Sequence, residues 1–271
     1  MHRSGVGGRG FGQWIGAVID VPPAVVDAVD AFWTGVLGWT VGPAWPGHPE
    51  FHHLEPPAGD SHVLVQAIDG PARIHLDLYV ADIDAEAARL VALGATLGER
   101  HAHWRVLSSP TGLPFCVVTS DRARERPSAP TWPDGHRSRL AQVCIDVPHG
   151  GLDEETAFWQ AVTGWTFRES DVPEFAGHLE PGPGGSMQLL VQELGADDPA
   201  GGSRVHLDLG TDDIEAEVCR LVELGADRVR DDRGWVVLRD PAGMLFCVTV
   251  QSPSEATLPP EKRGLDEPGT R

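Results

Sequence analysis

Two copies of one strand-and-helix pattern constrain the fold of this chain more than any other feature. Residues 73–83 read Arg-Ile-His-Leu-Asp-Leu-Tyr-Val-Ala-Asp-Ile, and residues 204–214 read Arg-Val-His-Leu-Asp-Leu-Gly-Thr-Asp-Asp-Ile. Alternating apolar and polar residues predict a strand in each copy, and an amphipathic helix follows, ending near Gly94 and Gly225. The chain is therefore predicted to be a duplication. Each half carries a His and an Asp on one face of an equivalent strand.

Further landmarks repeat in the same order along both halves. At offsets of 126 or 131 positions the chain repeats Ile19-Asp20-Val21 as Ile145-Asp146-Val147, Gly38-Trp39 as Gly164-Trp165, Trp104 as Trp235, and Cys116 as Cys247. The segments between these landmarks predict two units in each half, each with the order strand, helix, strand, strand, strand, and with Gly/Pro turns between strands.

The repeat also predicts the domain boundaries. We expect one domain over residues 13–120 and a second over residues 138–250. Residues 121–137, rich in Pro and charged side chains, are predicted to be a linker. Residues 1–12 and 251–271 are predicted to be a flexible N-terminus and a flexible tail.

Charge and hydropathy exclude several classes of partner. The chain has 271 residues and a formal net charge of −19, so it offers no basic face for nucleic acid or an anionic membrane. An acidic surface attracts cationic ligands, although solubility is the simpler explanation for this charge. No apolar run approaches a membrane span and no signal peptide opens the chain, which predicts a cytoplasmic protein.

The cysteines favour a reducing compartment. The four residues show no Cys-x-x-Cys spacing and stand in apolar stretches, at Cys116, Cys144, Cys219 and Cys247. This pattern is typical of buried free thiols rather than of disulfides or a structural zinc site.

The repeated units resemble the vicinal oxygen chelate superfamily, and within it tandem glyoxalase-like domains. The resemblance rests on Phe32-Trp33 before the Gly38-Trp39 helix end, on the His that opens the second unit, and on Asp240-Pro241-Ala242-Gly243 before the last strand. It implies an α+β fold with two tandem domains. In each domain paired βαβββ units would form a curled, cup-shaped mixed sheet with the helices outside.

Metal-dependent members of that superfamily place ligands at four matching positions. These positions correspond to Gly16, Gln66, His75 and Cys116 in the first domain, and to Gln142, Gln192, His206 and Cys247 in the second. Gly16 offers no donor atom, so the first set is incomplete. In the second set Cys247 replaces the expected carboxylate, which disfavours hard cations, although a thiolate favours zinc.

Two classes of function remain open. The first is a binding or sequestering protein that holds a small cationic or aromatic molecule in the cup of one or both domains, without a full catalytic metal site. The alternative is a metal-dependent lyase, isomerase or dioxygenase acting in the second domain through Gln142, Gln192, His206 and Cys247, with Zn, Fe, Mn or Ni. A third interpretation makes one domain a degenerate scaffold for the other. A homodimer is compatible with all three.

The binding hypothesis predicts which side chains contact the ligand. We expect the ligand to contact His75, Trp104, His178, Glu180, His206 and Trp235. The two Trp residues stand on strands of the curved sheet, where an indole ring can stack on a flat ligand. His75 and His206 are predicted to line the cup. His178 and Glu180 share a strand face and could supply acid–base groups, or only a polar rim.

Overall fold

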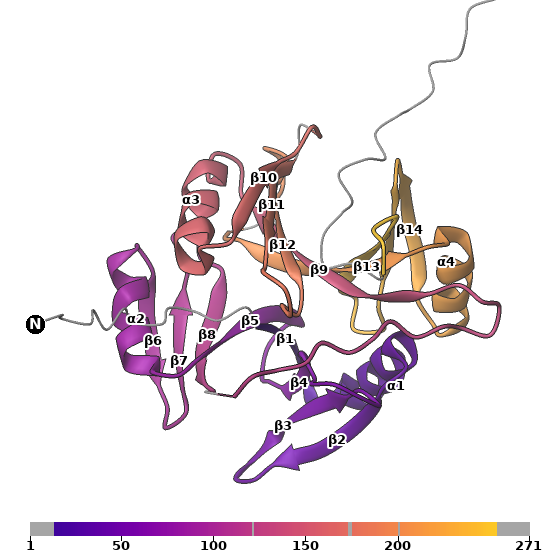
Figure 1. The fold of residues 1–271 in the computed structure, drawn as a ribbon, viewed down its shortest axis with the longest axis horizontal. Coiled ribbons are helices and arrows are strands. Elements are labelled where there is room, and N and C mark those ends of the chain that lie inside the picture. The colour runs from indigo at the N-terminus through magenta and orange to yellow at the C-terminus, as the bar shows by residue number, and fades with distance from the viewer. Residues whose placement is uncertain (1–13, 121, 173–174, 200, 254–271) are drawn as a thin grey trace, which may run out of the picture.

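The computed structural model describes residues 14–120, 122–172, 175–199 and 201–253, and contains two eight-stranded sheets and four α-helices (Figure 1). The first domain contains β1 (Ile15–Val21), the 3₁₀ helix η1 (Pro23–Val25), α1 (Val26–Leu37), β2 (Thr40–Trp45), β3 (His48–Glu55), β4 (Val63–Ala67), β5 (Arg73–Val80), α2 (Ile83–Ala92), β6 (Thr96–Arg100), β7 (Trp104–Ser108) and β8 (Pro114–Thr119). The second domain contains β9 (Ser138–Val147), α3 (Leu152–Thr163), β10 (Thr166–Glu169), β11 (Phe175–Glu180), β12 (Gln188–Glu193), β13 (Arg204–Thr211), α4 (Ile214–Glu223), β14 (Asp227–Asp232), β15 (Trp235–Arg239) and β16 (Leu245–Thr249).

Each sheet joins two βαβββ units along their first strands. The strand order is β2-β3-β4-β1-β5-β8-β7-β6 in the first domain and β10-β11-β12-β9-β13-β16-β15-β14 in the second. In the first domain β1 runs antiparallel to β5 and parallel to β4, while β5 runs parallel to β8. The predicted α+β fold, with two tandem domains and mixed sheets, is confirmed.

The two faces of each sheet differ in chemistry. On β5, Ile74, Leu76 and Leu78 are buried in one apolar core together with the helix residues. Side chains alternate along a strand, so His75 and Asp77 lie on the opposite face. The helices therefore cover the apolar face of the sheet, and the polar face forms the cup.

The ends of the helices follow the sequence signals. Asp82 caps α2, accepting hydrogen bonds from the backbone N–H of Asp84 at 3.1 Å and of Ala85 at 3.0 Å, as its position in the sequence predicts. α1 ends at Gly38, whose φ of 70° is left-handed and therefore suits glycine.

The two domains share one apolar core. The Phe32 ring of α1 packs 5.7 Å from the Phe246 ring of β16, and the Trp33 indole N–H donates to Asp240 Oδ2 at 3.1 Å. In the other direction across the interface, the Trp159 ring of α3 lies 5.3 Å from the Phe115 ring of β8. Figure 1 shows α3 above the strands β6–β8 of the first domain. Each domain thus packs a helix against the other's sheet.

Arginine side chains complete the helix ends across this interface. Arg220 of α4 donates to the carbonyl oxygens of Gly35 and Val36 at the end of α1, at 2.9 and 3.1 Å. Arg89 of α2 does the same at the end of α3, donating to Ala161 and Val162 at 3.0 and 2.8 Å. A cation beside these carbonyls satisfies acceptors that the helix leaves unpaired.

The predicted N-terminus, residues 1–12, and residues 254–271 of the predicted tail lie outside the described residues. All four thiols are free, as predicted, but Cys219 is exposed because it stands on the outer face of α4, so the prediction of burial is wrong for that residue. No helix in the described ranges has the length and hydropathy that crossing a membrane requires.

Candidate functional site

The repeated pattern of the two halves centres on one histidine in the cup of each domain. In the first domain, His75 Nδ1 lies 2.9 Å from Asp20 Oδ2 on the neighbouring strand β1. Asp20 is fully buried and also accepts a hydrogen bond from Arg73 Nε at 2.9 Å. This contact fixes the imidazole ring and leaves Nε2 directed at other groups.

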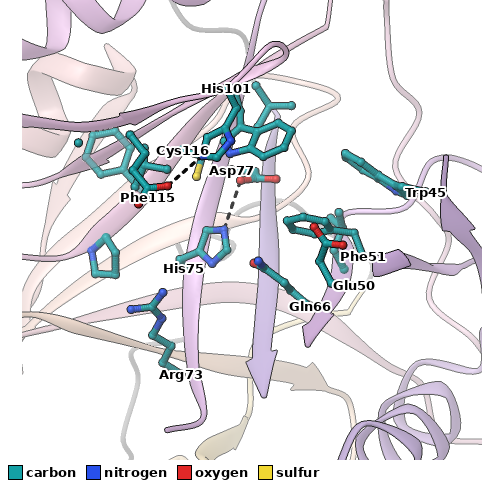
Figure 2. A pocket seen from close by; sticks show the side chains of 17 residues that line it. Trp45, Glu50, Phe51, Gln66, Arg73, His75, Asp77, His101, Phe115 and Cys116 are labelled. Atoms are coloured by element: carbon teal, nitrogen blue, oxygen red, sulfur yellow. Dashed lines mark hydrogen bonds and ion pairs between the residues drawn. The ribbon is translucent and has the colours of Figure 1, made fainter. Parts of the chain in front are cut away.

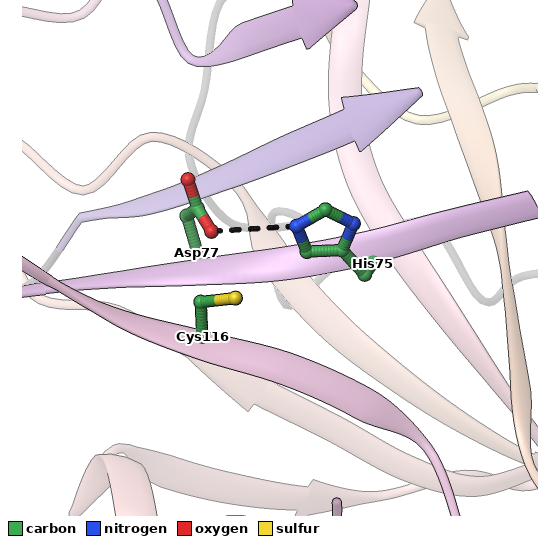
Figure 3. Close-up of side chains that lie close together, drawn as sticks. All are labelled: His75, Asp77 and Cys116. Carbon is green, nitrogen blue, oxygen red and sulfur yellow. Dashed lines mark ion pairs between the residues drawn. The ribbon is translucent and has the colours of Figure 1, made fainter. Parts of the chain in front are cut away.

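The second ring nitrogen of His75 faces an acid and a thiol. Nε2 lies 3.6 Å from Asp77 Oδ1, and the donor atoms of His75, Asp77 and Cys116 all lie within 4.8 Å of one another (Figure 3). Burial alone would lower the pKa of His75, but hydrogen bonds with Asp20, Asp77 and Cys116 outweigh burial and hold that pKa well above its usual value. Burial raises the pKa of the Cys116 thiol.

These three residues lie at the floor of a cavity of about 430 Å³ in the cup of the first domain (Figure 2). Trp104, predicted from sequence to line the cup, is one wall, and its ring stacks on His101 at 4.3 Å with an interplanar angle of 14°. A second aromatic pair, Trp45 and Phe51, stacks at 5.6 Å and also lines the cavity. The cavity therefore has aromatic walls above a polar floor.

Charged side chains of both signs line the same cavity. Glu50 and Glu99 contribute carboxylates, and Arg73 contributes a guanidinium that already contacts Asp20. Gln66 also lines the cavity. In the register of β1 and β4, Gln66 pairs with Asp20 rather than with Gly16, so it lies at the level of Asp20.

At Gly16, the first of the four positions, a neighbouring ring fills the space that a side chain would take. A Cβ built on Gly16 would lie 3.1 Å from the Tyr79 ring and 3.5 Å from Asp77 Cβ. The linker residue Arg124 covers Tyr79, with its guanidinium carbon 3.9 Å from the ring centroid. On the β1–β5 pair, the donors at this level are thus Asp77, the cross-strand partner of Gly16, and the Tyr79 hydroxyl, which lies 3.1 Å from the built Cβ.

The second domain repeats the histidine arrangement. His206 Nδ1 lies 3.0 Å from Asp146 Oδ2, and His206 Nε2 lies 3.3 Å from Asp208 Oδ1. The donor atoms of His206, Asp208 and Cys247 lie within 4.8 Å of one another, as do those of Cys144, Asp146 and His206. Burial lowers the pKa of His206, but the charges of Cys144, Asp146 and Asp208 outweigh it and raise that pKa well above its usual value.

Amide side chains occupy the second cup where the first has Gly16. Gln142 donates from Nε2 to Asp208 Oδ2, and Gln188 donates from Nε2 to Gln142 Oε1 at 2.5 Å. Gln192, the other predicted amide ligand, instead lies 3.8 Å from Cys144 Sγ. The structure therefore places Gln142 and Cys247 on the Asp208 side of His206, and Gln192 on the side of Cys144 and Asp146.

The remaining predicted ligand contacts of the second domain are partly engaged elsewhere. Glu180 Oε2 accepts a hydrogen bond from Arg168 Nε at 2.6 Å. Burial lowers the pKa of the half-buried His178. The Trp235 ring lies 5.6 Å from the Phe175 ring at an angle of 56°. Whether these side chains contact a ligand stays a prediction.

Sequence reasoning missed several residues of the first cup. Asp20 and Asp146 were noted only as repeat landmarks, although an acid repeated in a buried strand is itself a sign of a polar contact in the cup. Asp77 was seen to share a face with His75, but its position opposite Gly16 depends on strand register. His101, Trp45 and Phe51 gave no signal, because only tertiary structure brings their strand and turn together.

The comparisons with known proteins agree with this architecture. The sequence model of the glyoxalase-like domain matches residues 16–118 and 142–249, and the chain therefore belongs to the glyoxalase-like domain family. The predicted resemblance to the vicinal oxygen chelate superfamily is confirmed. A search among curated proteins found no match.

Among solved structures, the chain is similar to the Mn(II)-bound glyoxalase from Novosphingobium aromaticivorans, with 18% identity, a TM-score of 0.60, and coverage of 88% of this chain and 82% of that one. It is also similar to homoprotocatechuate 2,3-dioxygenase from Arthrobacter globiformis, with 14% identity, a TM-score of 0.58, and coverage of 91% and 81%. It spans 48% of a xylose isomerase-like TIM barrel/4-hydroxyphenylpyruvate dioxygenase fusion protein, with 16% identity, a TM-score of 0.56, and coverage of 89% of this chain. At these identities the likeness shows the fold alone.

Proposed function

We propose that this protein binds a small, flat, neutral or cationic aromatic molecule in the cup of its first domain. The observation that carries the proposal is the cavity of about 430 Å³ with aromatic walls and a polar floor. Cavities of this size, largely apolar with a few convergent polar groups, are the usual form of small-molecule sites.

The walls favour a planar ligand. The Trp104 and Phe51 ring centroids stand 6.0 Å apart at 69°, and the His48 ring meets the Trp104 ring at 5.2 Å. Together with Trp45 these rings form an aromatic corner on one side of the cavity. Stacking on such rings contributes about 0.5–1.5 kcal/mol beyond the area buried, and a cation over an indole adds a similar amount.

The charges favour a ligand that is not anionic. Asp77, Glu50 and Glu99 line the cavity against two cationic groups, Arg73 and His75, and both of these already contact the buried Asp20 at 2.9 Å. The formal net charge of −19 raises the local concentration of cations around the molecule as a whole.

Titration with proflavine, a planar cation, tests the proposal through the anisotropy of its fluorescence. We expect Trp104→Ala to weaken binding by about 5- to 30-fold, which corresponds to about 1–2 kcal/mol. Trp235→Ala, the matched change in the second domain, should leave the affinity unchanged. Lack of binding by the unaltered protein, or loss of binding in Trp235→Ala alone, would contradict the proposal, and 1-naphthalenesulfonate should bind more weakly than proflavine.

A second candidate function is that of a metal-dependent lyase, isomerase or dioxygenase. One observation favours it: His, Asp and Cys donors converge beside the ordered histidine of each cup. A divalent cation held there would polarise adjacent oxygens of a bound substrate. Metal analysis of untagged protein tests this function, and absence of stoichiometric metal after supplementation with zinc, manganese, iron or nickel would contradict it.

A further inference from the structure

At one of the four metal-ligand positions of the first domain the sequence offers no donor atom, but the fold brings a donor from the neighbouring strand close to it. Gly16 on β1 carries no donor, and its cross-strand partner on β5 is Asp77. Asp77 is 5% exposed, and its carboxylate points to the same place as His75 Nε2, 3.6 Å away. A carboxylate buried beside an imidazole and a thiol, with that single ion pair in the described chain, is suited to a further positive charge.

His75 is oriented as a metal ligand. Metal-binding imidazoles usually donate from the other ring nitrogen to a carboxylate, which fixes the ring and its tautomer. In the first cup Asp20 Oδ2 holds Nδ1 at 2.9 Å, and Arg73 in turn holds Asp20 at 2.9 Å. Nε2 is thus the nitrogen left for the cation. Asp20 is a positioning residue for this ligand.

The distances suit a small cation after slight side-chain rotation. The donor atoms of His75, Asp77 and Cys116 lie within 4.8 Å of one another. A tetrahedral zinc, with donors at about 2.0–2.3 Å, places its ligands roughly 3.3–3.8 Å apart. The three side chains come from β5 and β8, which are paired in parallel, and all three line the cavity. A fourth coordination position would therefore face the ligand cavity, as in catalytic rather than structural zinc sites.

We propose that the first domain binds a borderline divalent cation, best represented by zinc, through His75, Asp77 and Cys116. In this arrangement Asp77 supplies from β5 the donor that Gly16 lacks on β1. The inference rests on the second candidate function and names its domain, its ligands and its class of metal.

The second domain has the same donor types but a less available carboxylate. There Asp208 already accepts a hydrogen bond from Gln142, and the oxygen of Gln142 already accepts one from Gln188. A cation beside His206 could bind only Asp208 Oδ1, which has no hydrogen-bond partner in the described parts of the chain, and would compete with the Gln142 amide for the charge of the same carboxylate. Among the described residues, no amide chain lies at the level of Gly16 in the first cup, so its site is favoured.

Cobalt titration tests the proposal on the full-length, untagged, reduced protein. The chain would carry Cys219→Ser, because that exposed thiol could bind cobalt by itself. We expect one equivalent of Co²⁺ to bind and to produce a thiolate-to-cobalt charge-transfer band, and zinc to remove it. Cys116→Ser should abolish the band, and Asp77→Asn should raise the dissociation constant at least about ten-fold.

Matched variants in the second domain keep the test decisive. Cys247→Ser and Asp208→Asn should retain the band and the affinity, and Asp20→Asn should keep the band while weakening binding about 10- to 100-fold. Circular dichroism of each variant excludes unfolding as the cause. No cobalt binding, or a band that Cys247→Ser removes and Cys116→Ser spares, overturns the proposal. Proflavine binding by the metal-free protein is measured separately, so the two proposals fail independently.

Discussion

The two cups carry a large and a small residue at equivalent positions of two neighbouring strands, but on opposite strands. In the first domain β1 carries Gly16 and β5 carries Tyr79, whose ring lies 3.1 Å from a Cβ built on Gly16. In the second domain the bulk is exchanged: β9 carries Gln142, and β13 carries Gly210, where a Cβ would lie 2.7 Å from the carbonyl oxygen of Gln251. Each pair thus has one large and one small residue, in reversed positions, although the Gln251 backbone and Ala141, and not Gln142, lie beside Gly210.

This exchange decides what the neighbouring acid can do. The Tyr79 hydroxyl at the first site has no hydrogen-bond partner among the described residues, so Asp77 keeps its ion pair with His75 and lines the cavity. The amide at the second site donates to Asp208. The two cups therefore hold the same types of donor side chain, but the carboxylates differ in their hydrogen bonds because the residue opposite them on the neighbouring strand differs.

The largest effect is expected where the two domains are alike, in their shared core. Trp33→Ala should lower the free energy of unfolding by about 3–5 kcal/mol, because it removes a fully buried indole and leaves Oδ2 of the buried Asp240 without its donor. Trp159→Ala should have a similar effect, since that ring packs on Phe115. Urea denaturation measures both. A difference of more than about 2 kcal/mol between them would show that the interface is not equivalent in the two halves.

Acid should destabilise the protein through the first domain. Burial, with help from the charge of Arg139, lowers the pKa of His62 to about 3, while an unfolded histidine titrates near 6.5. Between these values only the unfolded state takes up the proton, so stability falls as pH decreases from about 6.5 toward 3, by about 1.4 kcal/mol for each pH unit at most. Above pH 6.5 neither state is protonated and the effect is absent.

The variant His62→Leu should remove this part of the pH dependence, as measured by urea denaturation at several pH values. The equivalent residue in the second domain is Gln188, which does not titrate. His149→Leu, at a histidine whose side chain is 62% exposed, is the control and should leave the slope unchanged. An unchanged slope in His62→Leu would rule out His62 as its source.

Exchanging the large and small residues tests the comparison directly. Gly16→Gln alone should cost about 1–3 kcal/mol, because the new side chain meets the Tyr79 ring. Tyr79→Gly creates the room, so the double variant should be more stable than the sum of the two single changes by at least about 1 kcal/mol. Additive losses in urea denaturation would show that the two positions do not share one space.

The smallest effect on stability is expected from releasing the acid in the second cup. Gln142→Ala should cost about 1 kcal/mol, because Gln188 loses its acceptor. It should also free Asp208 and raise cobalt binding in the Cys219→Ser protein from one equivalent to two. Unchanged stoichiometry would mean that the amide is not what distinguishes the cups.

The sequence predicted the architecture because the duplication and the strand periodicity both recur in each half. The caps and helix ends followed from single residues such as Asp82 and Gly38. The strand β6, Thr96–Arg100, gave no signal, because most of its side chains are exposed and it lacks apolar alternation. A sequence pattern reveals strands and helices that bury one face, because their apolar residues then recur with a fixed period.

The candidate sites were only partly predictable. His75 and Trp104 could be named from the repeat, and the structure places both in the cavity. The second domain was expected to hold the stronger metal site because Gln142 offers a donor where Gly16 offers none. The strand register argues against this expectation, because Asp77 stands opposite Gly16 in the first domain and Gln142 donates to Asp208 in the second. Cross-strand neighbours more than sixty residues apart cannot be paired from local sequence.

The arginines that complete helix ends across the interface bear on how such a duplication can evolve. Arg220 satisfies carbonyl groups at the end of α1, and Arg89 does so at the end of α3, so each half holds a part of the other's secondary structure. Two once-equivalent copies have thereby become an obligate pair. Either cup is free to diverge in its ligand, but neither copy can be deleted or exchanged without exposing the helix ends that its partner caps.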